Sequence, residues 1–191
     1  MSWVAYIDEA MRQRHDGTGL YVLAAAVMAD DDTMSIREAV RGLAGRRHRR
    51  VHWRDAEVSE RHKAVALVAD LSALHLVVIG VRLDLRRQER GRRLCLQRLL
   101  WELGRAGVSR ALLESRTAGL NAKDLALVNV LRVRGEIMHE LRVDFVYPLA
   151  EPLVWLPDIV AGAVSSARGD DDDRYLGPLK SILTEYSIEL D

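Results

Sequence analysis

The chain has 191 residues with 49% hydrophobic and 29% charged side chains, which fits one soluble domain with a substantial core. Its 28 Lys and Arg residues balance 28 Asp and Glu residues, so the formal net charge is zero. A single cysteine, Cys95, excludes an intrachain disulfide and a thiolate zinc cluster, and 5% aromatic residues argue against a stacking surface for single-stranded nucleic acid.

Apolar periodicity and turn signals predict strands and helices along most of the chain. The first two strands are joined by Asp16-Gly17-Thr18-Gly19, a sequence typical of a hairpin turn. In chain order we expect strand 3–8, strand 20–28, helix 33–43, helix 59–74, strand 75–85, helix 90–105, strand 110–114, helix 121–139, strand 143–147, helix 156–167 and a short helix within 175–190.

This order of elements predicts an α/β fold. An antiparallel pair followed by alternating helices and strands is typical of a mixed sheet, here five-stranded, flanked by helices. The helices between the second and third strands make residues 33–74 a helical insertion. No internal repeat or linker is evident, so we expect residues 1–191 to form a single domain.

Nothing in the sequence predicts export or membrane insertion. Asp8 and Glu9 interrupt the apolar run near the N-terminus, and no basic segment precedes that run, so it does not resemble a signal peptide. The long apolar stretch 149–167 contains two acids and two prolines, which a membrane span would not carry. We therefore expect a cytoplasmic protein without a membrane partner.

The zero net charge conceals a strongly uneven distribution. Residues 1–36 have a net charge of −4, residues 37–110 of +10 and residues 111–191 of −6. The basic third contains an arginine cluster that could hold a phosphate backbone and so bind RNA or DNA, formed by Arg46, Arg47, Arg49 and Arg50. The alternative is an ordinary solvated loop, or one that pairs with the acidic thirds.

Three acids stand at positions where a carboxylate is costly unless it is paired or bound to a metal. Asp8 ends the first strand, Glu114 ends the fourth, and Asp158 lies in an otherwise apolar helix. Convergent carboxylates offer the hard oxygen ligands that suit Mg²⁺ or Mn²⁺, and such ions support phosphodiester cleavage. Alternatively, each acid caps a helix or meets an arginine; Asp158 follows Pro157 and could serve the first turn.

Three motifs carry a resemblance to a known family: Tyr6-Ile7-Asp8-Glu9, Leu113-Glu114-Ser115-Arg116 and Leu156-Pro157-Asp158-Ile159-Val160-Ala161-Gly162. In order and placement they resemble the bacterial domain of unknown function 3800 family, which is similar to ribonuclease H-like proteins. The resemblance implies a ribonuclease H-like fold with Asp8 as the central metal ligand. It implies that Glu114 and Asp158 complete a Mg²⁺ or Mn²⁺ site, with Glu9 as a nearby catalytic residue.

The chain departs from the family pattern beside each of these acids. Ala10-Met11 follows Glu9 where the family usually has Ser-Gly, Glu114-Ser115-Arg116 stands where it often has Asp-Glu-Arg, and Pro157 replaces an alanine. In ribonuclease H itself a fourth acid comes from the helix corresponding to 90–105, and Glu102 is the candidate here, with a surface position as the alternative.

Other side chains offer weaker candidates. His52, in Val51-His52-Trp53-Arg54, could lie over the site and handle a proton or a phosphate, or simply pack beside Trp53. His48 and His52 have ligand-like spacing, but the surrounding arginines would repel a cation. Cys95 lies between two leucines on an apolar helix face, which favours a core position over a nucleophile.

Two functions follow from these patterns. The first is a metal-dependent nuclease that cleaves RNA or DNA through Asp8, Glu114 and Asp158, with the arginine cluster holding the backbone. The second is a catalytically degenerate ribonuclease H-like adaptor that binds nucleic acid or a protein partner, motivated by the departures at Ala10, Ser115 and Pro157. A third alternative is a subunit of a protein complex, in which the basic and acidic segments of this chain only balance each other's charge. The sequence does not determine the oligomeric state.

Overall fold

A computed structural model describes residues 2–14, 16–44 and 52–190. Six strands within these residues form one mixed sheet in the order β5-β4-β1-β2-β3-β6. The strands are β1 (Trp3–Gln13), β2 (Gly19–Ala29), β3 (Leu74–Leu83), β4 (Val108–Glu114), β5 (Arg142–Val146) and β6 (Leu183–Glu189). The first three strands pair antiparallel, whereas β4 joins β1, β5 joins β4 and β6 joins β3 in parallel.

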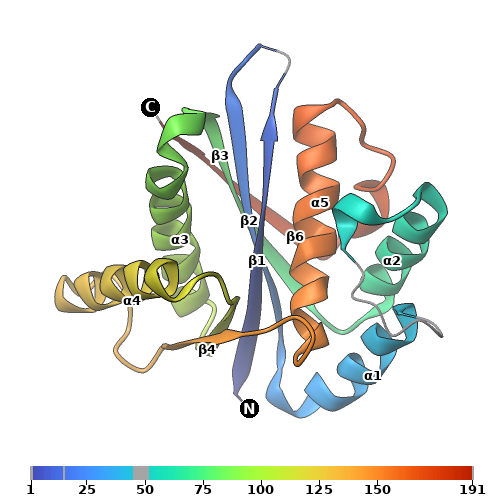
Figure 1. The fold of residues 1–191 in the computed structure, drawn as a ribbon. Coiled ribbons are helices and arrows are strands. Elements are labelled where there is room, and N and C mark those ends of the chain that lie inside the picture. Colours follow the sequence, from blue (N-terminus) through green and yellow to red (C-terminus); the bar gives the residue numbers. More distant parts are fainter. Residues whose placement is uncertain (1, 15, 45–51, 191) are drawn as a thin grey trace.

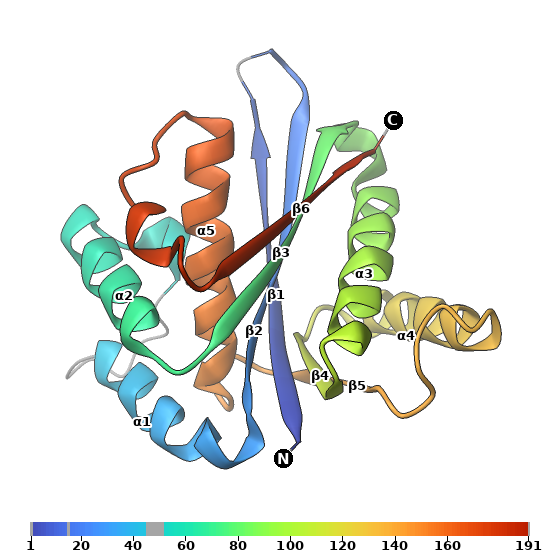
Figure 2. The same cartoon turned by 180° about the vertical axis from the view of Figure 1, so that it is seen from behind.

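Helices cover both faces of this sheet, so the molecule has three layers (Figures 1 and 2). The helices are α1 (Thr33–Leu43), α2 (Val58–Asp70), α3 (Gln88–Arg105), α4 (Ala118–Val133) and α5 (Trp155–Gly169). Helices α1, α2 and α5 pack on one face of the sheet, and α3 and α4 pack on the other. Each face has its own apolar core, and strand residues supply alternate side chains to the two cores.

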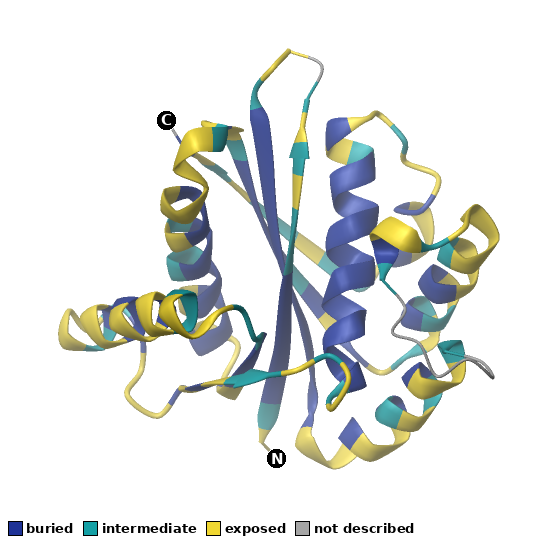
Figure 3. Ribbon diagram, viewed as in Figure 1, coloured by how far each residue is buried: buried dark blue, intermediate teal, exposed yellow. Residues whose placement is uncertain are grey.

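Strand β2 is the centre of the molecule, since all eleven of its residues are buried (Figure 3). Its sequence is a continuous apolar run because both of its faces are covered. Helix α5 packs directly over β1 and β2, and Ala161, Gly162 and Ala163 keep its side chains short. This arrangement brings α5, and with it Asp158, close to the polar half of β1.

The structure confirms the mixed sheet flanked by helices and most of the expected elements, but the prediction of five strands is wrong. The segment expected to hold a short helix forms β6, which pairs with β3 from His75 to Val81. The sequence Leu183-Thr184-Glu185-Tyr186-Ser187-Ile188-Glu189 favours a strand because its β-forming residues contact both cores at the sheet edge. Helices α1 and α2 occupy the segment between β2 and β3, where the helical insertion was expected.

Two ends of predicted elements also shift. Strand β1 continues beyond Asp8 to Gln13, because it pairs along its whole length with β2. Helix α4 ends at Val133 instead of near His139, and Gly135 beyond it has a φ of 68°, a left-handed conformation that closes helices. Within the described residues, no helix is long and apolar enough to span a membrane.

Candidate active site

Asp8 lies where β1 leaves the buried centre of the sheet, and its side chain is only 6% exposed. Burial raises the pKa of the Asp8 carboxyl well above its ordinary value, and the negative charges of Glu9, Glu114 and Asp158 raise it further. A hydrogen bond between the Asp8 and Glu114 side chains acts in the same direction. Two of these neighbours, Glu114 and Asp158, are the acids that the sequence placed with Asp8.

Strand alternation explains how the acids are sorted between the two faces of the sheet. Asp8 shares the α5 face with Tyr6, whereas Glu9 points to the α3 face. Glu114 ends the parallel neighbour strand β4, two residues after Leu112, which contributes to the core on the α5 face. Asp8, within β1, and Glu114, at the end of β4, therefore lie side by side on adjacent strands.

Asp158 enters the same region from the first turn of α5 and is 4% exposed. It does not cap its own helix. Its Oδ2 accepts a hydrogen bond of 2.8 Å from the backbone N–H of Trp53, and its Oδ1 lies 3.4 Å from Nδ1 of His52. Asp158 thus ties the segment before α2 to α5, a role that was not expected from the sequence.

Glu9 is paired with a buried arginine that the sequence analysis did not single out. Arg92, on α3, is 2% exposed and its Nη1 lies 2.6 Å from Oε2 of Glu9. The same guanidinium donates through Nε and Nη2 to both oxygens of Asp124, at 2.9–3.2 Å, and through Nη1 to the hydroxyl of Tyr21 at 3.3 Å. Glu9 therefore has a fixed counter-charge on the α3 face.

Asp124 also forms an ion pair with a second arginine. Arg116, which follows the motif acid Glu114, donates through Nη2 to both oxygens of Asp124 and through Nη1 to Glu89 at 2.7 Å. Its backbone N–H donates to Asn121, so the turn after β4 is fixed at both main chain and side chain. These ion pairs hold the α3 side of the site, and their partners are too far apart in sequence for a spacing argument to find them.

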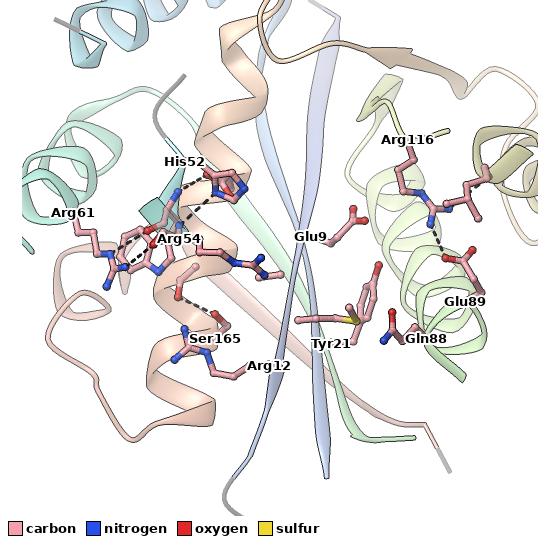
Figure 4. Close-up of a pocket in the computed structure, with 16 residues that line it drawn as sticks. Glu9, Arg12, Tyr21, His52, Arg54, Arg61, Gln88, Glu89, Arg116 and Ser165 are labelled. Atoms are coloured by element: carbon pink, nitrogen blue, oxygen red, sulfur yellow. Dashed lines mark hydrogen bonds and ion pairs between the residues drawn. The ribbon is translucent and has the colours of Figure 1, made fainter. Parts of the chain in front are cut away.

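A cleft of about 530 Å³ lies between the two groups of helices beside these acids. Figure 4 shows Glu9 in the middle, Arg116, Glu89, Gln88 and Tyr21 on the α3 side, and His52, Arg54, Arg61, Arg12 and Ser165 on the α5 side. Asp158 also lines the cleft. Acidic and basic side chains thus share one hollow, whereas Asp8 and Glu114 are not among its lining residues.

The acids do not form a ready-made metal cluster. Among residues 2–14, 16–44 and 52–190, no group of three or more His, Cys, Asp or Glu side chains is positioned to hold a metal ion. Asp8 is nevertheless buried among like charges, and such an arrangement favours a cation. The donor set of carboxylate oxygens is the chemistry that Mg²⁺ and Mn²⁺ prefer, so the residues fit such an ion.

Several other sequence candidates are placed by the structure. Arg46, Arg47, Arg49 and Arg50 lie outside the described residues, whereas His52 lines the cleft. Glu102 does not line the cleft; it is buried on α3 and pairs with Arg98 at 2.8 Å, so the surface position expected as its alternative is also wrong. Cys95 is fully buried in the core on the α3 face, and burial raises the pKa of its thiol to about 12.

The sheet order and the placement of helices define a ribonuclease H-like fold. Ribonuclease H2 from Pyrococcus horikoshii matches with a TM-score of 0.56 and 16% identity over 88% of this chain and 74% of that chain. RNase HII from Archaeoglobus fulgidus, in a complex with PCNA, gives a TM-score of 0.53 and 17% identity over 88% and 74%. Bst-RNase HIII in complex with Mn²⁺ matches with a TM-score of 0.55 and 16% identity, over 87% of this chain and 55% of that chain.

Identities this low show the shared fold alone. No protein-family model matches the sequence, and a comparison with curated proteins finds no match. The resemblance to the domain of unknown function 3800 family therefore depends on the three motifs around Asp8, Glu114 and Asp158.

Proposed function

We propose that this protein is a divalent-metal-dependent nuclease that cleaves phosphodiester bonds in RNA or DNA. The observation that carries the proposal is the burial of Asp8 among Glu9, Glu114 and Asp158, on a ribonuclease H-like fold and beside a cleft that Glu9 and Asp158 line. Buried like charges lower the stability of the fold, and groups that are kept despite this loss are typical of functional sites. We also propose membership of the domain of unknown function 3800 family, a single domain over residues 1–191 with 33–74 as an insertion, and a cytoplasmic location.

In this proposal Asp8, Glu114 and Asp158 hold Mg²⁺ or Mn²⁺. The ion would activate a water molecule and stabilise the charge on the leaving oxygen. The chain supplies the positions of its own carboxylates: the Trp53 N–H holds one oxygen of Asp158, and Arg92 keeps Glu9 turned toward α3. His52, 3.4 Å from Asp158, is placed to contact a substrate phosphate at the edge of the cleft.

A cleavage assay with an Asp8→Asn variant tests the proposal. The unmodified protein is expected to degrade single-stranded or duplex oligonucleotides with Mn²⁺ or Mg²⁺, and the variant is expected to lose at least about 100-fold of that rate, the usual contribution of a group that stabilises developing charge. EDTA should abolish the activity of the unmodified protein. Equal cleavage by both proteins would contradict the proposal.

The same variant provides its own folding control. Removing one of several buried, mutually repelling carboxylates should stabilise the fold by about 1 kcal/mol, which raises the melting temperature by about 2–4 °C for a chain of this size. A lower melting temperature would mean that lost activity reflects unfolding. Retention of activity by a stabilised variant would leave the carboxylates without a catalytic role.

A second candidate function is favoured by a different observation. Glu9 is paired with Arg92, Asp158 accepts a hydrogen bond from the Trp53 N–H, and the described residues hold no group of three side chains positioned to bind a metal ion. This arrangement suits an adaptor that keeps the fold and binds nucleic acid or a protein without cleaving it. Calorimetric titration with Mn²⁺ separates the two functions: binding that Asp8→Asn abolishes supports the nuclease, and no binding supports the adaptor.

A further inference from the structure

Three arginines from separate elements meet on the α5 side of the cleft. Arg12 comes from the exposed end of β1, Arg54 from the 3₁₀ turn η3 (Trp53–Asp55) and Arg61 from α2, and all three line the same hollow (Figure 4). Two of them belong to the segment between β2 and β3. The phosphate contacts expected in this segment from the sequence were at Arg46, Arg47, Arg49, Arg50 and His52, not at Arg54 or Arg61.

The three guanidinium groups act on one another. Burial lowers the pKa of Arg12, and the positive charges of Arg61 and Arg54 lower it further, while Asp172 opposes them. Like charges held together in this way destabilise the site until an anion joins them. The feature is therefore more than a solvated basic surface, on which arginines would spread apart.

Among the residues that the structure describes, Arg54 and Arg61 have no acidic partner. Arg61 donates through Nε to the backbone carbonyl of Trp53 at 3.1 Å and through Nη2 to that of Arg54 at 3.4 Å, and it stacks over the Trp53 ring at 5.0 Å. These contacts orient its charge without neutralising it. Arg54 is exposed, and its guanidinium makes no ion pair with any carboxylate among the residues that the structure describes.

Arg12 differs from the other two because it is paired with Asp170, directly after α5. Asp170 begins the four-acid run 170–173. Its side chain is 42% exposed, so it can move into solvent at little cost. An arriving anion would therefore compete with Asp170 for Arg12.

We infer that Arg12, Arg54 and Arg61 form a phosphate-binding subsite, which holds a backbone phosphate of the nucleic-acid strand that Asp8, Glu114 and Asp158 cleave. This deepens the proposed function and rests on it. Asp8 and Arg12 lie on the same face of β1, four residues apart, so the subsite is on the same side of the sheet as the carboxylates. Guanidinium groups bind phosphate oxygens through paired donors, which suits this ligand.

The inference is tested by binding, measured separately from cleavage. Fluorescence anisotropy measures binding of labelled single-stranded RNA, duplex DNA and an RNA–DNA hybrid of equal length. Ca²⁺ replaces Mg²⁺ so that binding is measured without cleavage, because Ca²⁺ takes oxygen ligands in looser geometry than Mg²⁺. Arg54→Gln and Arg61→Gln should each weaken binding of the preferred oligonucleotide by about tenfold. Each should also reduce the slope of log affinity against log salt by about 0.7–0.9, the loss of one phosphate contact.

Two further variants sharpen the result. Asp170→Asn removes the competitor of Arg12 and should increase affinity several-fold, opposite in sign to the arginine variants. Arg142→Gln, at an exposed position on β5 away from the cleft, is the matched control and should leave both affinity and slope unchanged. The Arg54 side chain makes no hydrogen bond or ion pair with the described part of the chain, so the fold of Arg54→Gln should remain intact.

The outcomes separate this inference from the proposed function. If Arg54→Gln and Arg61→Gln bind as tightly as Arg142→Gln, or if the unmodified protein binds none of the three oligonucleotides, the subsite is refuted. If the arginine variants lose binding while no protein cleaves, the subsite stands and the nuclease does not. If Asp8→Asn abolishes cleavage while the arginine variants bind normally, the nuclease stands and the subsite does not.

Discussion

Individual charged residues on the two sides of the cleft differ in how they are compensated. On the α3 side, Arg92 is 2% exposed and pairs with both Glu9 and Asp124, so removing it would take this partner from Glu9 and leave Asp124 with Arg116 alone. On the α5 side, Arg54 and Arg61 have no acidic partner among the described residues. The first arrangement stabilises the fold, and the second favours a ligand.

Replacing Arg92 should therefore be severe. Arg92→Met is expected to lower the free energy of unfolding by about 3–5 kcal/mol, because it uncovers buried charge. Arg134→Met is the matched control: Arg134 pairs with Glu136 at 3.7 Å with both side chains partly exposed, and its loss should cost less than about 1 kcal/mol. Urea denaturation of both variants measures the difference, and equal losses would contradict the assignment of Arg92 as a buried counter-charge.

His75, on β3, should make stability depend on pH. It is 1% exposed, neither of its ring nitrogens has a hydrogen-bond partner among the described residues, and burial lowers its pKa from 6.5 to about 4. The unfolded chain takes up a proton near pH 6.5, whereas the folded protein does so only near pH 4. His75 therefore leaves the free energy of unfolding unchanged above about pH 6.5, and it lowers that free energy progressively as the pH falls from 6.5 toward 4.

Urea denaturation at two pH values tests this prediction. Between about pH 7.5 and pH 5, the unmodified protein should lose about 2 kcal/mol more free energy of unfolding than His75→Leu, which cannot take up the proton. A variant with the same pH dependence as the unmodified protein would assign the effect to other groups.

At the scale of elements, the contact between η3 and α5 connects the helical insertion to the site. Gly162 on α5 has no side chain, and a Cβ there would overlap the indole ring of Trp53. The same Trp53 donates its backbone N–H to Asp158. The close approach of two elements therefore fixes the position of one proposed ligand.

Gly162→Ala should push Trp53 away from α5. We expect a loss of about 1–3 kcal/mol in the free energy of unfolding from overpacking, together with lower cleavage activity as the Trp53–Asp158 hydrogen bond is strained. Trp53→Leu in the same chain should restore part of the stability, because it removes the overlap. Gly104→Ala on α3, where a Cβ meets nothing within 4 Å, is the control and should be neutral or stabilising.

The elements that the sequence predicted well are those with a strong local signal. Strand β2 is apolar along its length, and α1 begins at Thr33 and ends at Leu43 as its pattern indicated. Strand β6 was missed because its alternation is short and half-exposed, and only pairing with β3 decides its conformation. Local sequence carries little information about such a partner.

At the scale of the whole molecule, topology brings together residues that are distant in sequence. The parallel pairing of β1 and β4 places Asp8 beside Glu114, and α5 adds Asp158, so the three acids named from the sequence lie near one another, while their role as metal ligands stays a prediction. The ion pairs of Arg92 and the meeting of Arg12, Arg54 and Arg61 could not be predicted, since each joins separate elements across the fold. The balance of charge over the chain likewise conceals an acidic and a basic group that share one cleft.

The length of β1 beyond the buried centre of the sheet has a consequence for where a nucleic-acid strand would be cut. Asp8 and Arg12 belong to one continuous strand that pairs with β2 throughout. At about 3.3 Å per residue, their backbones are about 13 Å apart, and pairing makes this separation rigid. Strand β1 would thus fix the distance between the phosphate bound at Arg12 and the phosphodiester bond cleaved at Asp8.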